Sequence, residues 1–449
     1  MKSIRLLACS ALVLLAACSG GGGGPVPSRG GDAPVPHGTP GPISLGGGKI
    51  QHVVIIVQEN RTVDNLFQGF PGADTASSGL DSSGRTTPLV PRSLRGAYDL
   101  SHTHRAFLKE YNAGALDGFD RAPCNSGACP VDGAYGYVPR SEVTPYWQLA
   151  ETYTFADRMF QSNAGPSFPA HAYLVAGTSV LSPGSRWYVA ENLTGVSSST
   201  DACDMPPGTK VELIDPLTGI EGATAYPCME HQTLFDLIDA AGLAWRYYEA
   251  GGVSASWDGP DAVRHIRNSS DYENDLATPS QFLTAIHTRP LASVTWITPT
   301  AAASDHAFLT DGSGPSWVAA VVNAIGQSPY WSSTAIFITW DDWGGWYDHV
   351  SPPQYNYYEL GFRVPLIVVS PYAKRGYVSH IQHEFGSILR FSEETLGLGS
   401  LGYTDARADD LRDCFDFNAP PQPYQIVPAA RGASYFRSLL PDRRSPDGE

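Results

Sequence analysis

Four apolar runs along the chain have the pattern of strands buried inside a sheet. Each is short, rich in β-branched and aromatic residues, and bounded by turn residues. They are residues 52–57 (HVVIIV), 293–298 (SVTWIT), 336–338 (IFI) and 364–369 (VPLIVV), and residues 243–248 (LAWRYY) form a further strand-like segment. Continuous apolar runs, rather than alternating ones, are typical of strands that are covered on both faces.

Helical patterns alternate with these strands. Residues 231–241 and residues 315–325 have helical patterns, and each segment is followed by a Gly, which is favoured just beyond a helix end. Ser379 and Gln382 have capping-box spacing, which predicts a further helix that opens there and buries one apolar face. The alternation predicts an α/β fold with a doubly wound, mostly parallel central sheet flanked by helices.

The N-terminal segment has the pattern of a bacterial export signal. Two basic residues precede an apolar run at residues 6–17 that is too short to span a membrane, and small residues lie directly before Cys18. This cysteine resembles the lipobox of bacterial lipoproteins, so we expect a signal peptide at residues 1–17 and a lipid on Cys18. Twelve Gly and six Pro within residues 19–48 make residues 18–48 a tether rather than a packed segment.

The rest of the chain, residues 49–449, is long enough to bury one large core, and 42% of all residues are hydrophobic. In an exported protein, cysteines close in sequence are expected to form disulfides, and no zinc-site spacing is present. Residues 183–230 are expected to be an irregular, disulfide-bearing insertion. The expected pairs are Cys124 with Cys129 and Cys203 with Cys228, which leaves Cys414 over.

The formal net charge of the chain is −16. Such an acidic surface argues against nucleic acid as a partner and against binding anionic lipid through a basic patch. A substrate that carries phosphate therefore needs local positive charge, most simply that of a metal ion.

Acidic and amide side chains follow two of the predicted strands. Glu59 and Asn60 come directly after the first strand, and Asp341 and Asp342 follow the strand at residues 336–338. In open α/β sheets, ligands bind beyond the carboxyl ends of the strands. Two adjacent carboxylates at such a point are a candidate metal site. The alternatives are a solvated acidic turn and an ordinary helix cap.

Ser167 lies between two prolines in the segment GPSFP, which fixes the backbone around it. The segment lacks the Gly-x-Ser-x-Gly pattern of the α/β-hydrolases, and an ordinary turn serine is the alternative. Histidines of interest stand in three other polar segments: His102, His265 and His306.

Six segments, taken in order, resemble the signature segments of the bacterial phosphoesterase family that contains phospholipases C and secreted acid phosphatases. That family belongs to the alkaline phosphatase-like superfamily, and the resemblance covers roughly residues 49–400. The six segments are HVVIIVQENRTVDNLF, SHTHRAFLKEYNAGALDGF, GPSFPAHAYLVAGTS, SDHAF, WSSTAIFITWDDWGGWYDHVSPP and VPLIVVSPYAKRGYVSH.

The resemblance implies a role for each candidate residue. The implied metal ligands are Glu59, Asn60, Ser167, Asp341 and Asp342, and Ser167 is also the implied nucleophile. The implied phosphoryl-binding and proton-donating residues are His102, His306 and, by a looser match, His265. Many relatives have Pro-Asn-Arg after the nucleophile where this chain has Pro169-Ala170-His171, so its substrate pocket is expected to differ.

The implied ligands are all oxygens, which favours one hard divalent cation, Ca, Mg or Mn, over zinc. Coordination to such a cation activates a serine hydroxyl for attack on phosphorus. A histidine that titrates near neutral pH is suited to protonating the leaving oxygen. Water would then hydrolyse the phosphoserine.

The favoured interpretation is a lipid-anchored, metal-dependent acid phosphatase that acts on phosphomonoesters at the periplasmic or outer face of a bacterial membrane. The family's phospholipases often have a Thr nucleophile and added C-terminal domains, whereas this chain has Ser167 and ends at residue 449. Two alternatives remain open. One is a phosphodiesterase of the phospholipase C type, and the other is a surface lipoprotein of the same fold that binds a ligand without turnover.

Overall fold

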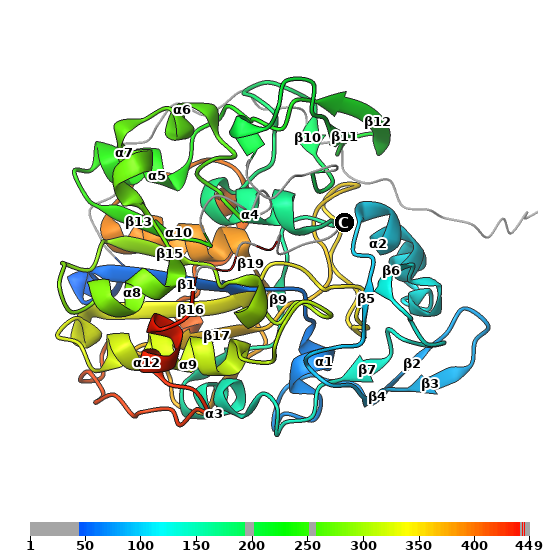
Figure 1. Ribbon diagram of the computed structural model, residues 1–449, viewed down its shortest axis with the longest axis horizontal. Helices are drawn as coiled ribbons and strands as arrows, with labels where there is room; N and C mark the ends of the chain where they lie inside the picture. The colour runs from blue at the N-terminus through cyan, green and yellow to red at the C-terminus, as the bar shows by residue number, and fades with distance from the viewer. Residues whose placement is uncertain (1–44, 194–201, 251–256, 441, 443, 445–449) are drawn as a thin grey trace, which may run out of the picture. The chain divides into compact units, whose positions relative to one another are not determined.

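An eight-stranded sheet forms the centre of the fold in the computed structural model (Figure 1). The structure describes residues 45–193, 202–250, 257–440, 442 and 444. The predicted signal peptide, Cys18 and the tether as far as residue 44 lie outside the described residues. In order across the sheet, the strands are β14 (Leu276–Ala277), β13 (Trp245–Tyr248), β15 (Val294–Ile297), β1 (His52–Gln58), β16 (Thr334–Trp340), β17 (Leu366–Val369), β8 (Thr154–Ala156) and β18 (Tyr377–Ser379).

The predicted parallel sheet is confirmed, with one exception. Among these eight strands only β17 runs against its neighbours, β16 and β8. The connection between β16 and β17, residues 341–365, contains no helix. The chain therefore re-enters the sheet at the edge where β16 ended, and a strand formed in that way is antiparallel.

Helices cover both faces of the sheet, as predicted for a doubly wound fold (Figure 1). All seven residues of β16 are buried beneath them, which explains the continuous apolar sequence of that strand. On one face lie α4 (Ser167–Ala176), α5 (Leu234–Ala240) and α10 (Phe385–Leu396). On the other lie α3 (Thr144–Thr152), α8 (Pro279–Ala285), α9 (Gly314–Gly326) and α12 (Ala433–Arg437).

Smaller elements lie outside the main sheet, and most follow β1 in the chain. Those between β1 and α3 are α1 (Val63–Phe67), β2 (Ser78–Leu80), β3 (Thr86–Pro88), β4 (Val90–Pro91), β5 (Tyr98–Leu100), α2 (His104–Tyr111), β6 (Cys124–Gly127) and β7 (Gly136–Tyr137). The others are β9 (Met159–Phe160), β10 (Tyr188–Val189), β11 (Val211–Asp215), β12 (Ile220–Ala225), α6 (Arg264–Arg267), α7 (Ser270–Asp275), β19 (His383–Glu384) and α11 (Thr404–Arg407).

The predicted start of the last long helix was wrong. Ser379 ends strand β18, and its hydroxyl group donates to the carboxylate of Asp413 instead of capping a helix. Helix α10 begins at Phe385, where Glu384 is the N-cap and forms a capping box with Ser387. Capping-box spacing is therefore present twice in this segment, and the pairing of β18 with β8 decides which one is used.

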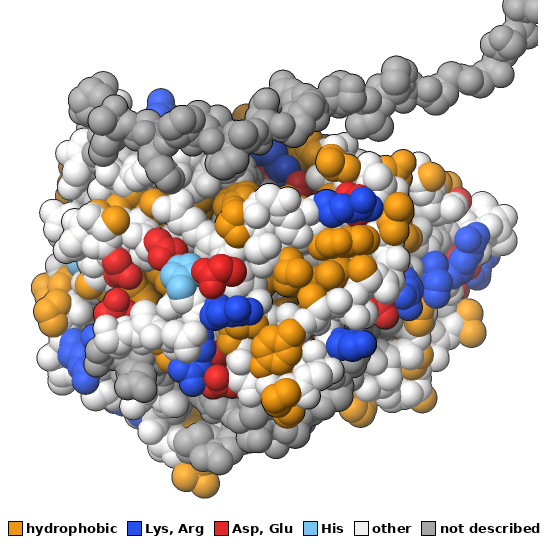
Figure 2. Space-filling view, turned by 90° about the horizontal axis from the view of Figure 1, so that it is seen from above, with side chains coloured by type: hydrophobic (Ala, Val, Ile, Leu, Met, Phe, Trp, Pro, Cys, Tyr) orange, Lys and Arg blue, Asp and Glu red, His pale blue; other side chains and the backbone are white. Residues whose placement is uncertain are grey.

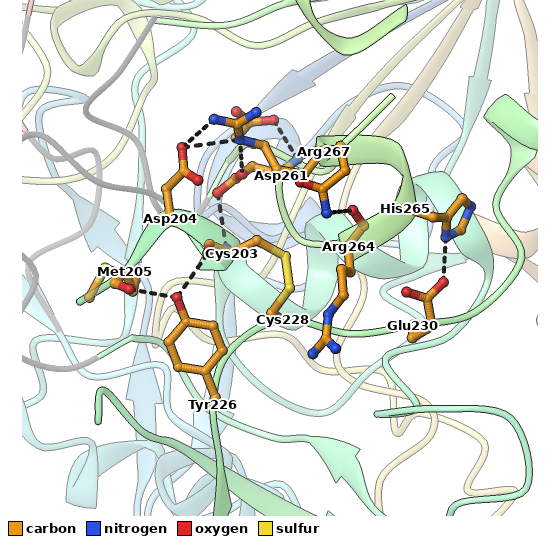
Figure 3. Close-up of a disulfide and its surroundings, with 12 residues drawn as sticks. Cys203, Asp204, Met205, Tyr226, Cys228, Glu230, Asp261, Arg264, His265 and Arg267 are labelled. Carbon is orange, nitrogen blue, oxygen red and sulfur yellow. Dashed lines mark hydrogen bonds and ion pairs between the residues drawn. A yellow bond between two sulfur atoms is a disulfide. The ribbon is translucent and has the colours of Figure 1, made fainter. Parts of the chain in front are cut away.

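Both predicted disulfides are present. The Cα atoms of Cys124 and Cys129 are 5.7 Å apart, and those of Cys203 and Cys228 are 4.6 Å apart (Figure 3). Cys414 is buried and unpaired. The insertion at residues 183–230 is more regular than predicted, because β10, β11 and β12 form an antiparallel sheet within it.

Among the described residues, no helix combines the length and the apolar character that crossing a membrane requires. On the face seen in Figure 2, the described Lys and Arg side chains lie in small groups among acidic and apolar ones.

A buried ionic network joins the loop after β16 to the start of α1. The side chain of His349 lies 2.7 Å from Asp64 Oδ2 and 3.0 Å from Asp74 Oδ1. Arg363 is fully buried and pairs with Asp348 at 2.8 Å. Burial by itself lowers the pKa of His349, but the hydrogen bond and charge of Asp64 outweigh it and raise the pKa to about 9. This network fixes the loop that leads away from Asp341 and Asp342.

The raised pKa makes stability depend on pH. Protonation of His349 is favoured in the folded state, so its contribution is fully present below the ordinary pKa of 6.5 and is lost as pH rises through about 9. We expect the His349→Gln variant to be less stable than wild type at pH 6, with the difference shrinking between about pH 6.5 and 9. Chemical denaturation of both proteins across this range measures it, and a difference that does not change with pH would contradict the assignment.

Candidate active site

The ends of two neighbouring strands bring four of the predicted site residues together. Strands β1 and β16 pair in parallel with Gln58 opposite Trp340. The next residues, Glu59–Asn60 on one strand and Asp341–Asp342 on the other, therefore leave the sheet side by side. All four side chains are at most 1% exposed, so the solvated-turn alternative does not describe this acidic pair.

Helix α4 places Ser167 against the same group. Pro166 is the N-cap and Ser167 is the first helical residue, so the serine side chain lies at the helix start. Its Oγ atom is 3.2 Å from Asp342 Oδ2 and 3.3 Å from Glu59 Oε2. The loop before the helix is held by the side chain of Gln161, which donates to the carbonyl of Gly165 at 2.9 Å.

Backbone N–H groups orient the two aspartates. Asp341 Oδ1 accepts from the N–H groups of Asn60 (3.1 Å) and Asp342 (2.8 Å), and Asp342 Oδ1 accepts from that of Gly344 (2.7 Å). Asn60 has a positive φ of 60°, a left-handed conformation that Asn tolerates better than most residues. The site is thus shaped by a tight approach between the two strand ends.

The donor set fits a divalent cation. Asp341 Oδ2 and Asn60 Oδ1 are buried oxygens for which the described part of the chain provides no hydrogen-bond partner. Buried carboxylates so close together repel one another unless a cation or a proton intervenes. Glu59 and Asp341 also belong, together with His171, to one of three groups of side chains whose ligand atoms lie within 4.8 Å of one another.

Two of the three predicted histidines lie beside this group. His102 Nε2 is 3.0 Å from the Asn60 side-chain nitrogen and 3.9 Å from Asp342 Oδ2, and its Nδ1 lies 3.0 Å from the Leu100 carbonyl. The rings of His102 and His306 are 5.7 Å apart. Both rings are at most 1% exposed.

The turn that carries His306 is anchored by a buried arginine. Arg61 donates to the carbonyl oxygen of Asp305 from Nε at 3.0 Å and from Nη2 at 2.8 Å. Burial raises the pKa of the Asp305 carboxyl to about 6, and the hydroxyl group of Tyr146 donates to it at 2.7 Å. These contacts fix the position of His306 relative to β1.

The structure does not bring His265 to this cluster. His265 lies on α6, near the disulfide between Cys203 and Cys228 (Figure 3), and is 38% exposed. Its two ring nitrogens contact Glu230 Oε1 and Asp236 Oδ1 at 2.5 and 2.8 Å. These carboxylates raise the pKa of His265 against the opposing effect of burial, as expected for a surface ion pair.

A histidine that the sequence analysis did not assign to the site takes part in it instead. His171 Nε2 is 3.4 Å from Glu59 Oε1 and 3.9 Å from Asp341 Oδ2. Burial lowers the pKa of His171 to about 4. His171 follows Ser167 by four positions, and residues four apart lie on the same face of a helix. That spacing was the signal that could have identified it.

Comparison with known proteins agrees with this geometry. A family model described as the Phosphoesterase family matches residues 50–399, a range that contains every residue of the cluster. The chain belongs to the Phosphoesterase family. It is therefore a hydrolase that acts on phosphoric ester bonds. Phosphoesterases of this superfamily use metal ions, which agrees with the donor set found here.

Curated relatives of this phosphoesterase are distant but cover most of it. Phospholipase C A of Mycobacterium tuberculosis is 24% identical over 434 residues, which span 83% of this chain and 78% of that protein. Hemolytic phospholipase C of Pseudomonas aeruginosa is 25% identical over 442 residues, which span 82% and 56%. A solved structure of an alkaline phosphatase superfamily protein from Vibrio parahaemolyticus covers 80% of this chain and 70% of that one, with 10% identity and a TM-score of 0.36.

The approach of the two strand ends leaves no room at Gly344. Gly344 has a φ of 63°, and a Cβ atom there would lie 2.4 Å from the Asn60 carbonyl oxygen. Gly84 has a φ of 80° and open space around it, so Gly84→Ala is a matched control that carries only the left-handed strain, about 1–2 kcal/mol. We expect Gly344→Ala to lower the free energy of unfolding by clearly more than the control, and to weaken metal binding by moving Asn60. Equal losses in the two variants, measured by denaturation, would contradict this account.

Proposed function

We propose that this phosphoesterase is a metal-dependent phosphomonoesterase of the acid phosphatase type that uses Ser167 as its nucleophile. The position of the Ser167 hydroxyl group supports the proposal, because it lies at a helix start within 3.3 Å of two carboxylates. The complete burial of Ser167 favours a phosphoryl group that projects from a slender substrate.

The reaction would proceed in two balanced steps. Ser167 Oγ loses its proton and forms a bond to phosphorus, and the bond from phosphorus to the ester oxygen breaks. Water then attacks the phosphoserine, which releases phosphate and restores the hydroxyl group. A bound divalent cation supplies positive charge that offsets the carboxylates and favours the ionised hydroxyl group.

The side chains around Ser167 have separate tasks in this mechanism. The carboxylates of Glu59 and Asp342 hold the hydroxyl group in position. His102 and His306 lie together at one side of the cluster, where they bind phosphoryl oxygens and protonate the leaving oxygen. The start of α4 also faces the phosphoryl group with its positive dipole end.

We propose one cation per chain, held by Glu59, Asn60, Ser167, Asp341 and Asp342. Their oxygen donors suit a hard cation such as Ca, Mg or Mn. The cellular setting is also a proposal: export, with anchoring to a bacterial membrane through a lipid on Cys18 and the flexible segment that follows it.

A phosphodiesterase of the phospholipase C type is the second candidate, because the curated relatives named above are phospholipases C. Release of phosphate from an aryl phosphomonoester, compared with release of choline phosphate from phosphatidylcholine, distinguishes the two. Turnover of neither substrate, by protein loaded with metal, would favour the non-catalytic binding lipoprotein.

Ser167→Ala tests the nucleophile. We expect the variant to fold normally and kcat to fall by at least about a thousandfold, because no second nucleophile is proposed. Ser162→Ala is a matched control, since Ser162 is equally buried and donates to Glu384 rather than to the cluster. Acid quenching during turnover should trap a phosphoenzyme at Ser167. A phosphoryl group mapped to another residue would overturn the assignment.

Asp341→Asn tests the metal site. Asn can still accept both backbone hydrogen bonds through Oδ1, so the substitution changes mainly the charge at Oδ2. We expect metal affinity and kcat to fall by about a hundredfold or more. In chelator the variant should be at least as heat-stable as wild type, because repulsion among the carboxylates is relieved. An active variant with unchanged metal content would remove Asp341 from the site.

A further inference from the structure

His171 faces the carboxylates through one defined ring nitrogen. Its Nε2 is the atom that approaches Glu59 Oε1 and Asp341 Oδ2, at 3.4 and 3.9 Å. Three ligand atoms bonded to one ion at about 2.1 Å lie about 3–4 Å from one another. The separations found here match that spacing before any side chain moves. Asp341 Oδ2 is also one of the two buried oxygens without a hydrogen-bond partner in the described chain.

Residues behind the ring determine which nitrogen carries the proton. The Tyr247 hydroxyl group donates to the Trp257 carbonyl at 2.5 Å, so its own proton is already used. The Tyr247 oxygen can therefore only accept from His171 Nδ1, which lies 3.5 Å away. A proton on Nδ1 leaves the lone pair of Nε2 directed at Glu59 and Asp341. Such contacts behind a histidine commonly orient it as a metal ligand.

In this tautomer the Nε2 lone pair faces two carboxylate oxygens, and all three groups are acceptors. The arrangement is repulsive unless a cation lies among them or a second proton makes the ring an imidazolium. The ring is 1% exposed, and the indole of Trp257 stacks on it at a centroid distance of 6.4 Å. An apolar face of this kind disfavours the imidazolium form.

We infer that His171 is a nitrogen ligand of the cation, and that the site therefore prefers a first-row transition ion of the manganese type over calcium or magnesium. This inference rests on the metal-dependent function proposed above and narrows the choice among the hard cations. Calcium and magnesium bind oxygen donors almost exclusively, whereas imidazole increases affinity for transition ions. The ligand set then includes a nitrogen on the same helix face as Ser167.

The test measures metal binding rather than turnover, so it is separate from the test of the nucleophile. The full chain is freed of metal and titrated with Mn²⁺ and with Ca²⁺ in competition with a chelating dye. Pulsed electron paramagnetic resonance of the Mn²⁺ form then reports directly bonded nitrogen. Wild type should show the nitrogen coupling and should bind Mn²⁺ at least about tenfold more tightly than Ca²⁺.

Variants identify the nitrogen. His171→Asn keeps an oxygen donor, so we expect Mn²⁺ affinity to fall about ten- to a hundredfold, Ca²⁺ affinity to change little, and the nitrogen coupling to disappear. His102→Gln should retain the coupling. His231→Asn removes another buried imidazole, away from the site, and should change neither affinity nor coupling.

Each contrary result overturns the inference. Absence of nitrogen coupling in wild type would mean that His171 is only a counter-charge to Glu59 and Asp341. Persistence of the coupling in His171→Asn would assign the nitrogen to another residue. Mn²⁺ binding without nitrogen would refute the inference and leave the proposed function intact, whereas absence of any metal binding would refute both.

Discussion

The structure depends on holding three like charges, the carboxylates of Glu59, Asp341 and Asp342, together out of water. Such a group repels itself strongly in a medium of low dielectric constant. The protein reduces this repulsion by directing backbone N–H groups at Asp341 and Asp342. The left-handed backbone of Asn60 and the close approach of Gly344 follow from this arrangement. The remaining unbalanced charge is what makes a cation necessary.

The reacting groups are placed by rigid elements. Two paired strands position the carboxylates, and the first turn of α4 positions Ser167 together with His171. Only the histidines on the far side, His102 and His306, come from loops. The loop that carries His306 is held by two hydrogen bonds from buried Arg61. A site built in this way needs little rearrangement when substrate arrives.

Much of the fold and part of the site could be predicted because local sequence determines them. Buried strands have continuous apolar runs, and their ends place Glu59 and Asp341 where ligands bind. The direction of β17 was missed because it depends on the lack of a crossover helix. The start of α10 was missed because tertiary pairing used Ser379 in a strand. The positions of His171 and His265 depend on contacts between distant segments, which local patterns do not encode.

The pairing of β1 with β16 also determines when the site can exist. Asn60 contacts side chains 281 and 282 positions further along the chain, so neither half of the protein contains a metal site of its own. A chain that crosses a membrane unfolded would carry no assembled site with it. The ion it acquires is then decided by the metal supply of the compartment where β1 and β16 meet, and not by that of the compartment where the chain is made.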